Sequence, residues 1–226
     1  MENYLFESDP DSGYIPAPIP EPTLRRLPLY HNYLKKLDGS RFPSISCTKI
    51  AEDLKLTPIQ VRKDLAFTGI VGKPKTGYEV AALCSAIESF LGWNNTKEAM
   101  LFGAGHLGLA LLSYAGFANY GLEIVAALDP DPAKQGPGPR NKEILPLKKG
   151  ADLIRRMHIK IAIIAVPEAE AQATADLSVS CGIKAIWNFA PVKIAVPAGV
   201  IVQHENLASS LAVLSKKLTS AVPEPV

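Results

Sequence analysis

The chain of 226 residues has 47% hydrophobic and 20% charged residues, a globular composition that excludes a disordered, collagenous or coiled-coil class. Its net charge of +2 is unevenly distributed, because residues 1–15 carry four acidic and no basic side chains whereas residues 16–92 carry eleven basic against seven acidic ones. A basic segment of this size is compatible with nucleic-acid binding but is also common on solvated helices that bind nothing.

The cysteines and the hydropathy indicate the compartment. Cys47, Cys84 and Cys181 are odd in number, far apart and without C-x-x-C spacing, so neither a zinc site nor a disulfide framework is expected. No apolar run approaches the roughly 18 residues that a membrane span needs, and the N-terminus does not resemble a signal peptide. We therefore expect a cytoplasmic protein with no membrane segment.

Both ends of the chain are rich in proline, and a helical first domain follows the N-terminal one. Residues 1–18 are predicted to be a flexible leader and residues 219–226 a similar tail, since proline removes backbone donors and the few apolar side chains there cannot build a core. Residues 19–92 are predicted to form a winged-helix DNA-binding domain, and apolar residues recur within it at the helical period of 3.6. These residues are Leu27, Tyr30, Leu34, Leu37, Ile50, Leu54, Val61 and Leu65.

Residues 30–69 have the spacing of a helix-turn-helix. A short amphipathic helix follows Ser46, a turn follows it, and Thr57 with Pro58 supplies the cap and first position of a second helix. The second helix is expected to direct three apolar side chains toward the core: Ile59, Val61 and Leu65. Its polar residues are Gln60, Arg62 and Lys63.

These polar residues are candidates for DNA contact. Glutamine can read adenine and arginine can read guanine in the major groove, while lysine more often binds phosphate. A solvated amphipathic helix would carry the same residues. The next segment, 69–78, is too rich in glycine and proline for a helix and suits a β-hairpin that presents Lys73 and Lys75. A basic hairpin after a helix-turn-helix is typical of a winged helix, the alternative being a loop whose lysines confer solubility.

The apolar period changes near residues 92–96, where we place the domain boundary. In residues 93–204 short apolar runs alternate with helical stretches, as in βαβ units on a parallel sheet. The runs are Ala99–Phe102, Ile124–Leu128, Ile161–Val166, Ala185–Phe189 and Val200–Val202. The predicted class is therefore α/β: an N-terminal winged helix-turn-helix domain followed by a Rossmann-type parallel-sheet domain.

A glycine loop connects the first run to a helix. Its residues are Gly103, Ala104, Gly105, His106, Leu107 and Gly108. The first glycine permits a tight turn, the second lets a pyrophosphate approach the backbone, and the third lets the helix pack closely on the strand. Asp129 ends the next strand 21 residues after Gly108, where a carboxylate can bind the adenosine ribose and would repel a 2′-phosphate. This pattern predicts an NAD(H) site, with NADP(H) disfavoured.

The second domain lacks the residues expected of a dehydrogenase active site. His106 is expected to be a loop residue and not a catalyst. Ala118, not lysine, follows Tyr114 at the fourth position, so the Tyr-x-x-x-Lys arrangement of short-chain dehydrogenases is absent. The remaining histidines have no spacing for a metal: His31, His158 and His204. The site is therefore predicted to bind a nucleotide without transforming it.

Taken together, these motifs resemble the Rex redox-sensing transcriptional repressors over about Ile19 to Leu218. The order and spacing of the motifs are specific, although no single one is decisive. The motifs are Arg26-Leu27-Pro28-x-Tyr30, Val61-Arg62-Lys63-Asp64-Leu65, Gly77-Tyr78-Glu79-Val80, the glycine loop with Tyr114-x-Gly116-Phe117, Asp129-Pro130-Asp131-Pro132, Val166-Pro167 with Ala171-Gln172, and Asn188-Phe189-Ala190-Pro191.

The resemblance implies a homodimer that represses genes by binding pseudo-palindromic operator DNA and leaves the DNA when NADH binds. Residues 205–218 would form a helix that swaps onto the partner, with an apolar stripe of leucines at 207, 211, 214 and 218. The operator would be contacted by Arg62, Lys63, Lys73 and Lys75. Tyr114 would belong to the switch, the part of the protein that changes between the DNA-bound and the NADH-bound state. The nicotinamide end of the site would be lined by Val166, Pro167, Asn188, Phe189, Ala190 and Pro191.

Some positions depart from the pattern of the resembled family. Its members commonly have arginine where Asn32 stands and aspartate where Asn206 stands, and these form an intersubunit charge pair in one state of the switch. A neutral pair contributes less than a charged one. We therefore hypothesise a divergent member whose response to NADH is altered, weakened or lost. The wing carries Lys73-Pro74-Lys75 in place of Lys-Arg-Gly, so the operator sequence stays open.

Other functions remain open at this point. An NAD-dependent oxidoreductase with an incidental N-terminal domain is one, and the missing acid–base pair argues against it. A Rossmann-like domain that binds another nucleotide or coenzyme A and serves protein interaction is another, which Asp129 disfavours. A third is a divergent paralogue that binds DNA with weak or no redox response.

Overall fold

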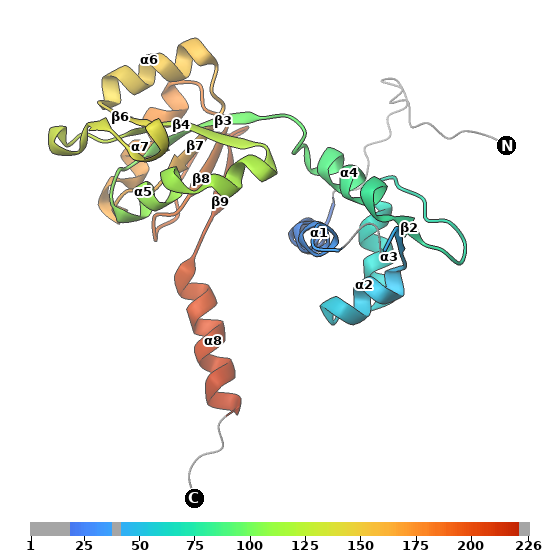
Figure 1. The fold of residues 1–226 in the computed structure, drawn as a ribbon. Helices are drawn as coiled ribbons and strands as arrows, with labels where there is room; N and C mark the ends of the chain where they lie inside the picture. The colour runs from blue at the N-terminus through green and yellow to red at the C-terminus, as the bar shows by residue number, and fades with distance from the viewer. Residues whose placement is uncertain (1–18, 38–41, 222–226) are drawn as a thin grey trace, which may run out of the picture. The chain divides into compact units, whose positions relative to one another are not determined.

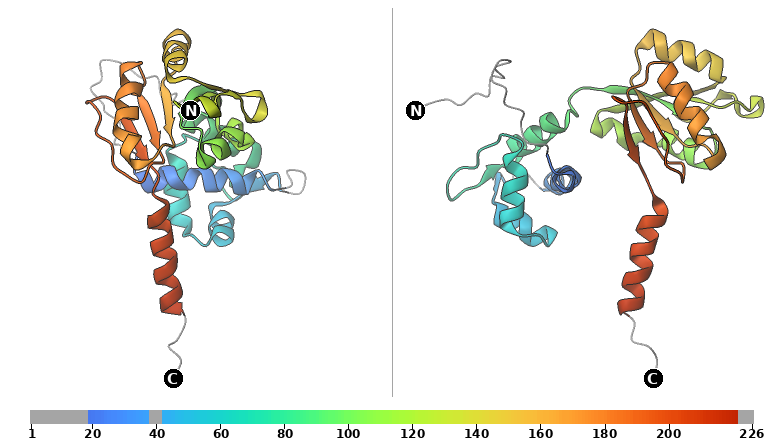
Figure 2. Two further views of the ribbon diagram at one scale, coloured as in Figure 1. Left: turned by 90° about the vertical axis from the view of Figure 1, so that its left-hand side faces the viewer. Right: turned by 180° about the vertical axis from the view of Figure 1, so that it is seen from behind.

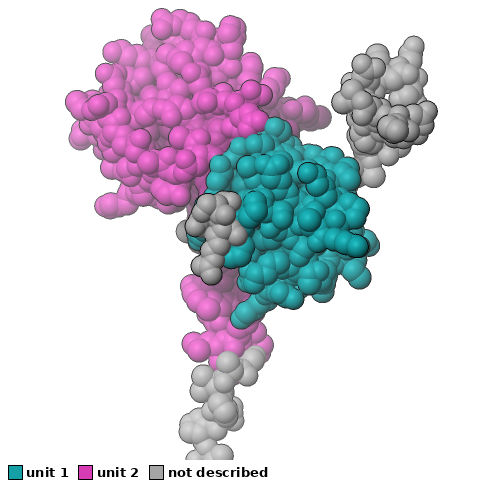
Figure 3. All heavy atoms as spheres, turned by 45° about the vertical axis from the view of Figure 1, so that its right-hand side comes forward, with its two compact units in different colours: residues 1–92 teal, residues 93–226 magenta. Residues whose placement is uncertain are grey.

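The computed structural model describes residues 19–37 and 42–221 (Figure 1). The predicted leader, residues 1–18, and residues 222–226 of the predicted tail lie outside the described residues. The chain divides between Gly92 and Trp93 into two compact units, which Figure 3 colours separately. Each unit has a hydrophobic core of its own.

The first unit consists of helices and a very small sheet. Its helices are α1 (Glu21–Leu34), α2 (Cys47–Leu54), α3 (Pro58–Ala66) and α4 (Val80–Leu91). Six of the eight residues that recur at helical spacing are buried in the core, with Leu27, Ile50 and Leu65 fully buried, whereas Leu37 and Leu54 are half-buried against it. Helix α2 packs on α3, and α1 packs on both α3 and α4, so the core joins all four helices.

The small sheet fixes the place where the wing, residues 69–78, ends. Strand β1 (Ser44–Ile45) pairs antiparallel with β2 (Tyr78–Glu79), and Lys73 forms one bridge with Gly77. Gly77 has φ +81°, and a Cβ on it would collide with the backbone of Ile45. Only glycine fits there, because this conformation and this close approach both exclude a side chain. The segment that ends at Tyr78 therefore returns to the domain at a fixed place.

The second unit is built on a seven-stranded sheet with the order β5-β6-β4-β3-β7-β8-β9. The strands are β3 (Lys97–Phe102), β4 (Leu122–Leu128), β5 (Gly136–Pro137), β6 (Glu143–Leu145), β7 (Ile161–Ile164), β8 (Ala185–Asn188) and β9 (Ile201–His204). All neighbouring pairs are parallel except β5 with β6. The order reverses direction between β3 and β7, which is the switch point where open α/β sheets bind ligands.

Helices cover both faces of this sheet (Figures 1 and 2). Met100 and Phe102 of β3 face a core shared with α6 (Leu147–Met157) and α7 (Glu168–Ser180). Ala99 and Leu101 face the opposite core, which includes Leu112 of α5 (His106–Ser113). This alternation, with both faces buried, explains why the strands appear in the sequence as continuous apolar runs.

Two parts of the second unit differ from the sequence expectation. Strands β5 and β6 were not predicted, because they are only two and three residues long and β5 consists of a glycine and a proline. The last helix, α8 (Leu207–Ala221), continues three residues beyond the predicted end at Leu218. Asn206 is its cap: its side-chain oxygen accepts a hydrogen bond from the Ser209 N–H at 3.1 Å.

Within the part of the chain that the structure describes, no helix is long and apolar enough to cross a membrane. The same residues contain no group of three or more histidine, cysteine, aspartate or glutamate side chains that could hold a metal ion.

Candidate DNA-binding face and nucleotide-binding loop

Local capping produces the turn between α2 and α3. Ser46 Oγ accepts a hydrogen bond from the Lys49 N–H at 3.1 Å, and Thr57 Oγ1 accepts one from the Gln60 N–H at 3.3 Å. Lys55 adopts the left-handed conformation, with φ 56°. Each cap satisfies an N–H that the first helical turn leaves without a partner. The chain can therefore leave α2 and begin α3 within three residues.

A buried acid anchors α3 to α1. Asp64, on the inner side of α3, accepts two hydrogen bonds from the Arg26 guanidinium, from Nε to Oδ2 at 2.7 Å and from Nη2 to Oδ1 at 2.8 Å. Tyr30 donates to Oδ2 at 2.6 Å, and Thr23 donates to Oδ1 at 2.8 Å. A bidentate arginine restricts both distance and angle. The network therefore sets how α3 lies against α1.

The same contacts determine the protonation of the network. Burial alone would raise the pKa of Asp64, but the hydrogen bonds from Arg26, Tyr30 and Thr23 hold it below its ordinary value of 3.8. Asp64 raises the pKa of Arg26 in turn, and burial together with Asp64 raises the pKa of Tyr30. The carboxylate is thus ionised at neutral pH and has partners on both oxygens.

The outer side of α3 carries exposed cations. Arg62 and Lys63 are exposed, and Gln60 is half-buried. Lys73 and Lys75, on the wing, are also exposed. Arg62 and Lys63 therefore lie on the outward side of α3, whereas Gln60, four residues before Asp64, lies only about 40° around the helix from that anchoring residue.

One expectation for α3 is wrong. Val61 and Leu65 are fully buried, as predicted, but Ile59 is 67% exposed. At 100° per residue, Ile59 lies about 200° around the helix from Val61, so the two side chains cannot enter the same core. Ile59 instead shares a side of the helix with Arg62 and Lys63, three and four residues ahead.

In the second unit, the glycine loop leads from β3 to α5. Gly103 has φ +96°, and a Cβ there would come within 2.5 Å of the Ala165 carbonyl oxygen. A Cβ on Gly108 would overlap the Gly103 carbonyl, so this glycine allows α5 to pack against the loop. A Cβ on Gly105 would meet nothing within 4 Å. The space over Gly105 is therefore open, which is the condition for a phosphate to approach the backbone at the N-terminus of α5.

Asp129 lies directly against this loop. The residue is 3% exposed, and its carboxylate accepts hydrogen bonds from the N–H groups of Ala104 at 2.8 Å and Asp131 at 2.9 Å. Burial would raise the pKa of Asp129, but these N–H groups and Lys134, whose Nζ lies 3.3 Å from Oδ2, hold it below its ordinary value. Asp129 thus holds the loop in shape, and its contact with a ribose stays a prediction.

The segment predicted for the nicotinamide end follows β8. Asn188 is fully buried, donating to the Val192 carbonyl at 2.8 Å and accepting from the Ala190 N–H at 3.1 Å. Its side chain therefore shapes the loop from within, while Phe189 is half-buried and Pro191 exposed. Val166 and Pro167 lie in the loop between β7 and α7. Since β7 and β8 are parallel neighbours, their carboxyl ends place these two segments at one edge of the sheet.

A row of aromatic rings connects Tyr114 with this segment. The ring centroids are 4.9 Å apart for Tyr114 and Phe117, 5.7 Å for Phe117 and Trp187, and 4.9 Å for Trp187 and Phe189. Trp187 also donates from Nε1 to Glu205 at 3.0 Å, one residue before the cap of α8. Tyr114 could be identified from the sequence, but this row of rings could not, because no local spacing connects residue 117 with residue 187.

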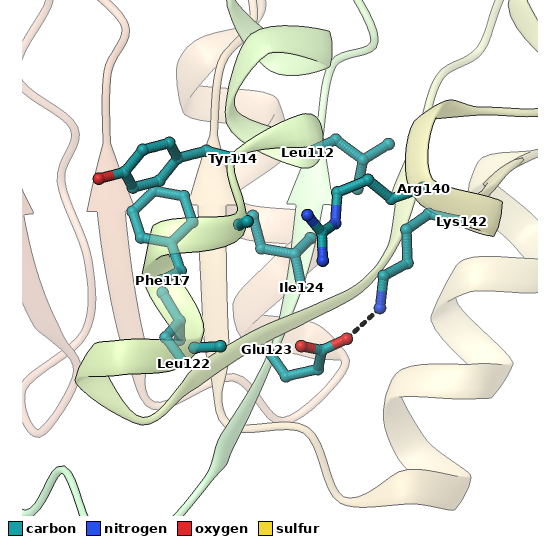
Figure 4. A pocket seen from close by; sticks show the side chains of 10 residues that line it. Leu112, Tyr114, Phe117, Leu122, Glu123, Ile124, Arg140 and Lys142 are labelled. Atoms are coloured by element: carbon teal, nitrogen blue, oxygen red, sulfur yellow. Dashed lines mark hydrogen bonds and ion pairs between the residues drawn. The ribbon is translucent and has the colours of Figure 1, made fainter.

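A small cavity lies beside Tyr114 (Figure 4). Phe117 and Ile124 contribute its apolar lining, and Arg140 and Lys142 its basic lining. Its volume of about 150 Å³ is the space of roughly five water molecules. A dinucleotide does not fit there, so the open space over the glycine loop remains the candidate site.

Asn32 and Asn206, predicted to act together, lie in different units. Asn32 is exposed on α1, and Asn206 caps α8. Their pairing across a subunit boundary stays a prediction. His106 was expected in a loop but is the first residue of α5, where it is exposed, and Leu107 beside it is 40% exposed.

Comparisons with known proteins agree with this two-unit arrangement. Residues 18–66 match the family described as "Putative DNA-binding protein N-terminus", and residues 94–192 match the family described as "CoA binding domain". A redox-sensing transcriptional repressor Rex from Treponema denticola is 49% identical over 193 residues, covering 85% of this chain and 92% of that protein. The chain belongs to the Rex family. The Rex repressor of Bacteroides thetaiotaomicron is 42% identical over 205 residues, covering 88% of this chain and 91% of that protein.

Solved Rex structures match both units. A crystal structure of the Rex-family repressor RSP with β-NAD⁺ and operator DNA has a TM-score of 0.84 and 35% identity, covering 91% of this chain and 94% of that chain. RSP with β-NADH has a TM-score of 0.80 and 35% identity, covering 89% and 95%. The predicted fold class, a DNA-binding domain followed by a Rossmann-type domain, is confirmed. Rex proteins are regulators, so the oxidoreductase alternative is rejected.

Proposed function

We propose that this protein is a transcriptional repressor that binds operator DNA as a homodimer, senses the ratio of NADH to NAD⁺, and is released from DNA by NADH. The observation that carries this function is the presence in one chain of an exposed basic recognition helix and a glycine loop open to a dinucleotide. The names of the Rex relatives and the ligands of the RSP structures support it. A repressor works where the DNA is, so we expect it in the cytoplasm.

On the DNA side, α3 would enter the major groove. Gln60 and Arg62 would reach base edges, and Lys63 with Lys73 and Lys75 of the wing would bind phosphates. Two copies related by a two-fold axis would read a pseudo-palindrome only when their α3 helices are separated by whole turns of DNA, roughly 34–36 Å each. The distance between the two α3 helices is thus the quantity that a regulator has to change.

On the nucleotide side, the residues present fit NAD(H). Gly103, Gly105 and Gly108 would hold the pyrophosphate at the N-terminus of α5, and Asp129 would hold the ribose hydroxyls. The nicotinamide would lie near residues 166–167 and 188–191. NADH and NAD⁺ differ by a hydride and a ring charge, so these segments would have to make the discrimination. A ligand shifts an equilibrium only by its different affinities for the two states.

The last helix would complete the dimer. Leu211, Leu214 and Leu218 are each more than 60% exposed in the single chain. A helix with such an apolar stripe gains stability when another surface covers it. We infer that α8 packs on a second copy of the chain, which would connect Asn206 at its start with the partner.

The two asparagines would weaken the switch. Asn206 can cap α8 as aspartate can, but it cannot form a charge pair with Asn32. We infer a weaker response to NADH than the charged pair would give. NADH titrated into the protein–operator complex tests this inference: complete release at low micromolar NADH, opposed by NAD⁺, would contradict it. A double variant, Asn32→Arg with Asn206→Asp, is expected to release DNA at lower NADH than the natural chain.

The proposed function is tested by selecting operators from random DNA in three parallel reactions, with NAD⁺, with NADH and without nucleotide. We expect a pseudo-palindrome to be enriched with NAD⁺ or no nucleotide, and depleted by NADH. If no DNA sequence were enriched in any of the three reactions, the proposal would be rejected.

Coenzyme A is a second candidate ligand, because residues 94–192 match a family named for it. Thermal melting with NAD⁺, NADH and coenzyme A separates the candidates, since only a ligand that binds the folded chain raises the melting temperature. We expect NADH to raise the melting temperature. A melting temperature that rises only with coenzyme A would contradict the assignment of NAD(H) as the ligand.

A further inference from the structure

An exposed isoleucine stands at the start of the recognition helix. Ile59 is the second residue of α3, after Pro58, and it is 67% exposed. It belongs neither to the core of the first unit nor to the half-buried residues packed against that core. Covering a large exposed apolar side chain with another apolar surface lowers the free energy, because it removes apolar area from water.

The surroundings of Ile59 indicate what covers it. Arg62 and Lys63 follow at three and four residues on the same side of α3, and both are exposed. A protein partner that covered Ile59 would also have to remove these cations from water, at a cost unless each met an acid. A polyanion would instead bind the cations while Ile59 lay between them.

DNA offers one apolar group in the major groove, the C5-methyl of thymine. The first turn of a recognition helix is the part that approaches base edges most closely. We infer that Ile59 is a specificity-determining residue that packs against a thymine methyl in each half of the operator. This inference rests on the proposed function and adds a base preference that Arg62 and Gln60 do not supply.

The test replaces thymine by deoxyuridine, which lacks only the methyl group. The operator recovered by selection is synthesised with one such replacement at a time, made symmetrically in both half-sites. Each methyl removed from a packed contact weakens binding roughly fourfold, so the symmetric pair weakens it by about fifteenfold. We expect one position to show this loss with the natural chain and no loss at that position with Ile59→Ala.

Matched variants separate this contact from general effects. Ile59→Val is expected to keep most of the sensitivity to the methyl, because it retains a branched apolar side chain. Leu29→Ala also removes an exposed apolar side chain, 55% exposed on α1, and should leave the sensitivity complete. Arg62→Ala should lower the affinity for every operator while keeping the sensitivity. Equal melting temperatures of Ile59→Ala and the natural chain would show that the exposed side chain does not hold the fold.

Two results would overturn the inference while leaving the proposed function intact: an operator whose thymine methyls can all be removed without loss, or a loss that Ile59→Ala retains in full. A chain that selects no operator at all would instead reject the proposed function, and the thymine contact with it.

Discussion

At the residue scale, the Asp64 network is a contact that only the fold could show. The Arg26 and Asp64 motifs were visible in the sequence, but 38 residues separate the partners and no local rule pairs them. The caps at Ser46 and Thr57 could be predicted, because a cap depends on residues three positions away. Contacts within a few residues were thus predictable, and contacts between elements were not.

Asp64→Ala is expected to lower the free energy of unfolding of the first unit by about 3 kcal/mol, because it removes the charge partner of Arg26. Chemical denaturation measures the loss. Asp53→Ala is a control, because Asp53 pairs with Lys49 on the surface and its loss should change stability much less. Equal losses for the two variants would contradict the role assigned to the network.

The same network predicts a pH dependence. The folded chain lowers the pKa of Asp64, so the network stabilises the fold above the ordinary pKa of 3.8 and loses that contribution as the pH falls through the lower folded value. The stability difference between the natural chain and Asp64→Ala should therefore be constant from pH 7 to about pH 5 and shrink below pH 3.8. A difference that grows on acidification would contradict this.

Arg62 and Gly105 should separate the two binding activities. Arg62→Ala removes an exposed cation of α3 and is expected to lower operator affinity while NADH affinity is unchanged. Gly105→Val fills the open space over the loop without a backbone penalty, since Gly105 has φ −77°, so NADH binding should be lost while the fold is kept. Anisotropy with labelled operator and NADH fluorescence measure the two affinities. Loss of both activities in either variant would argue against separate sites.

At the element scale, the parallel strands could be predicted because both faces are buried and the sequence runs are apolar. Strands β5 and β6 could not be predicted, because both are very short, β5 is the edge strand of the sheet, and a turn separates the two. Ile59 was expected in the core because it is apolar, but its angle around α3 places it on the outer side of the helix.

The aromatic row predicts a fluorescence signal. Trp187 lies one residue before the segment expected at the nicotinamide end and contacts both Phe117 and Phe189. NADH binding should quench Trp187, and the Trp187→Phe variant, which keeps Trp93, should lose that quenching. Unchanged quenching in the variant would place the nicotinamide elsewhere.

The exposed leucines of α8 predict the effect of charge on assembly. Leu211→Glu with Leu214→Glu should convert the dimer to a monomer of unchanged stability in the second unit, because these side chains are exposed in the single chain. Light scattering after size exclusion measures the mass. Lys216→Glu changes a charge on the opposite side of the helix and should leave the dimer intact. A double variant that remains dimeric would contradict the assigned role of α8.

At the scale of the whole molecule, the sequence placed both units and the glycine loop, because capping, period and glycine spacing are local properties. The connection between the units could not be derived in this way. In the proposed dimer it would depend on contacts with a second copy of the chain, and such contacts have no spacing in the sequence.

The central claim is that NADH and operator DNA bind to different states of one conformational equilibrium. The most direct test is whether the two ligands change each other's affinity reciprocally. NADH affinity is measured with and without saturating operator, and operator affinity with and without saturating NADH. We expect each ligand to weaken the binding of the other by one common factor, between roughly 5 and 150. NADH affinity that is the same with and without operator would contradict it.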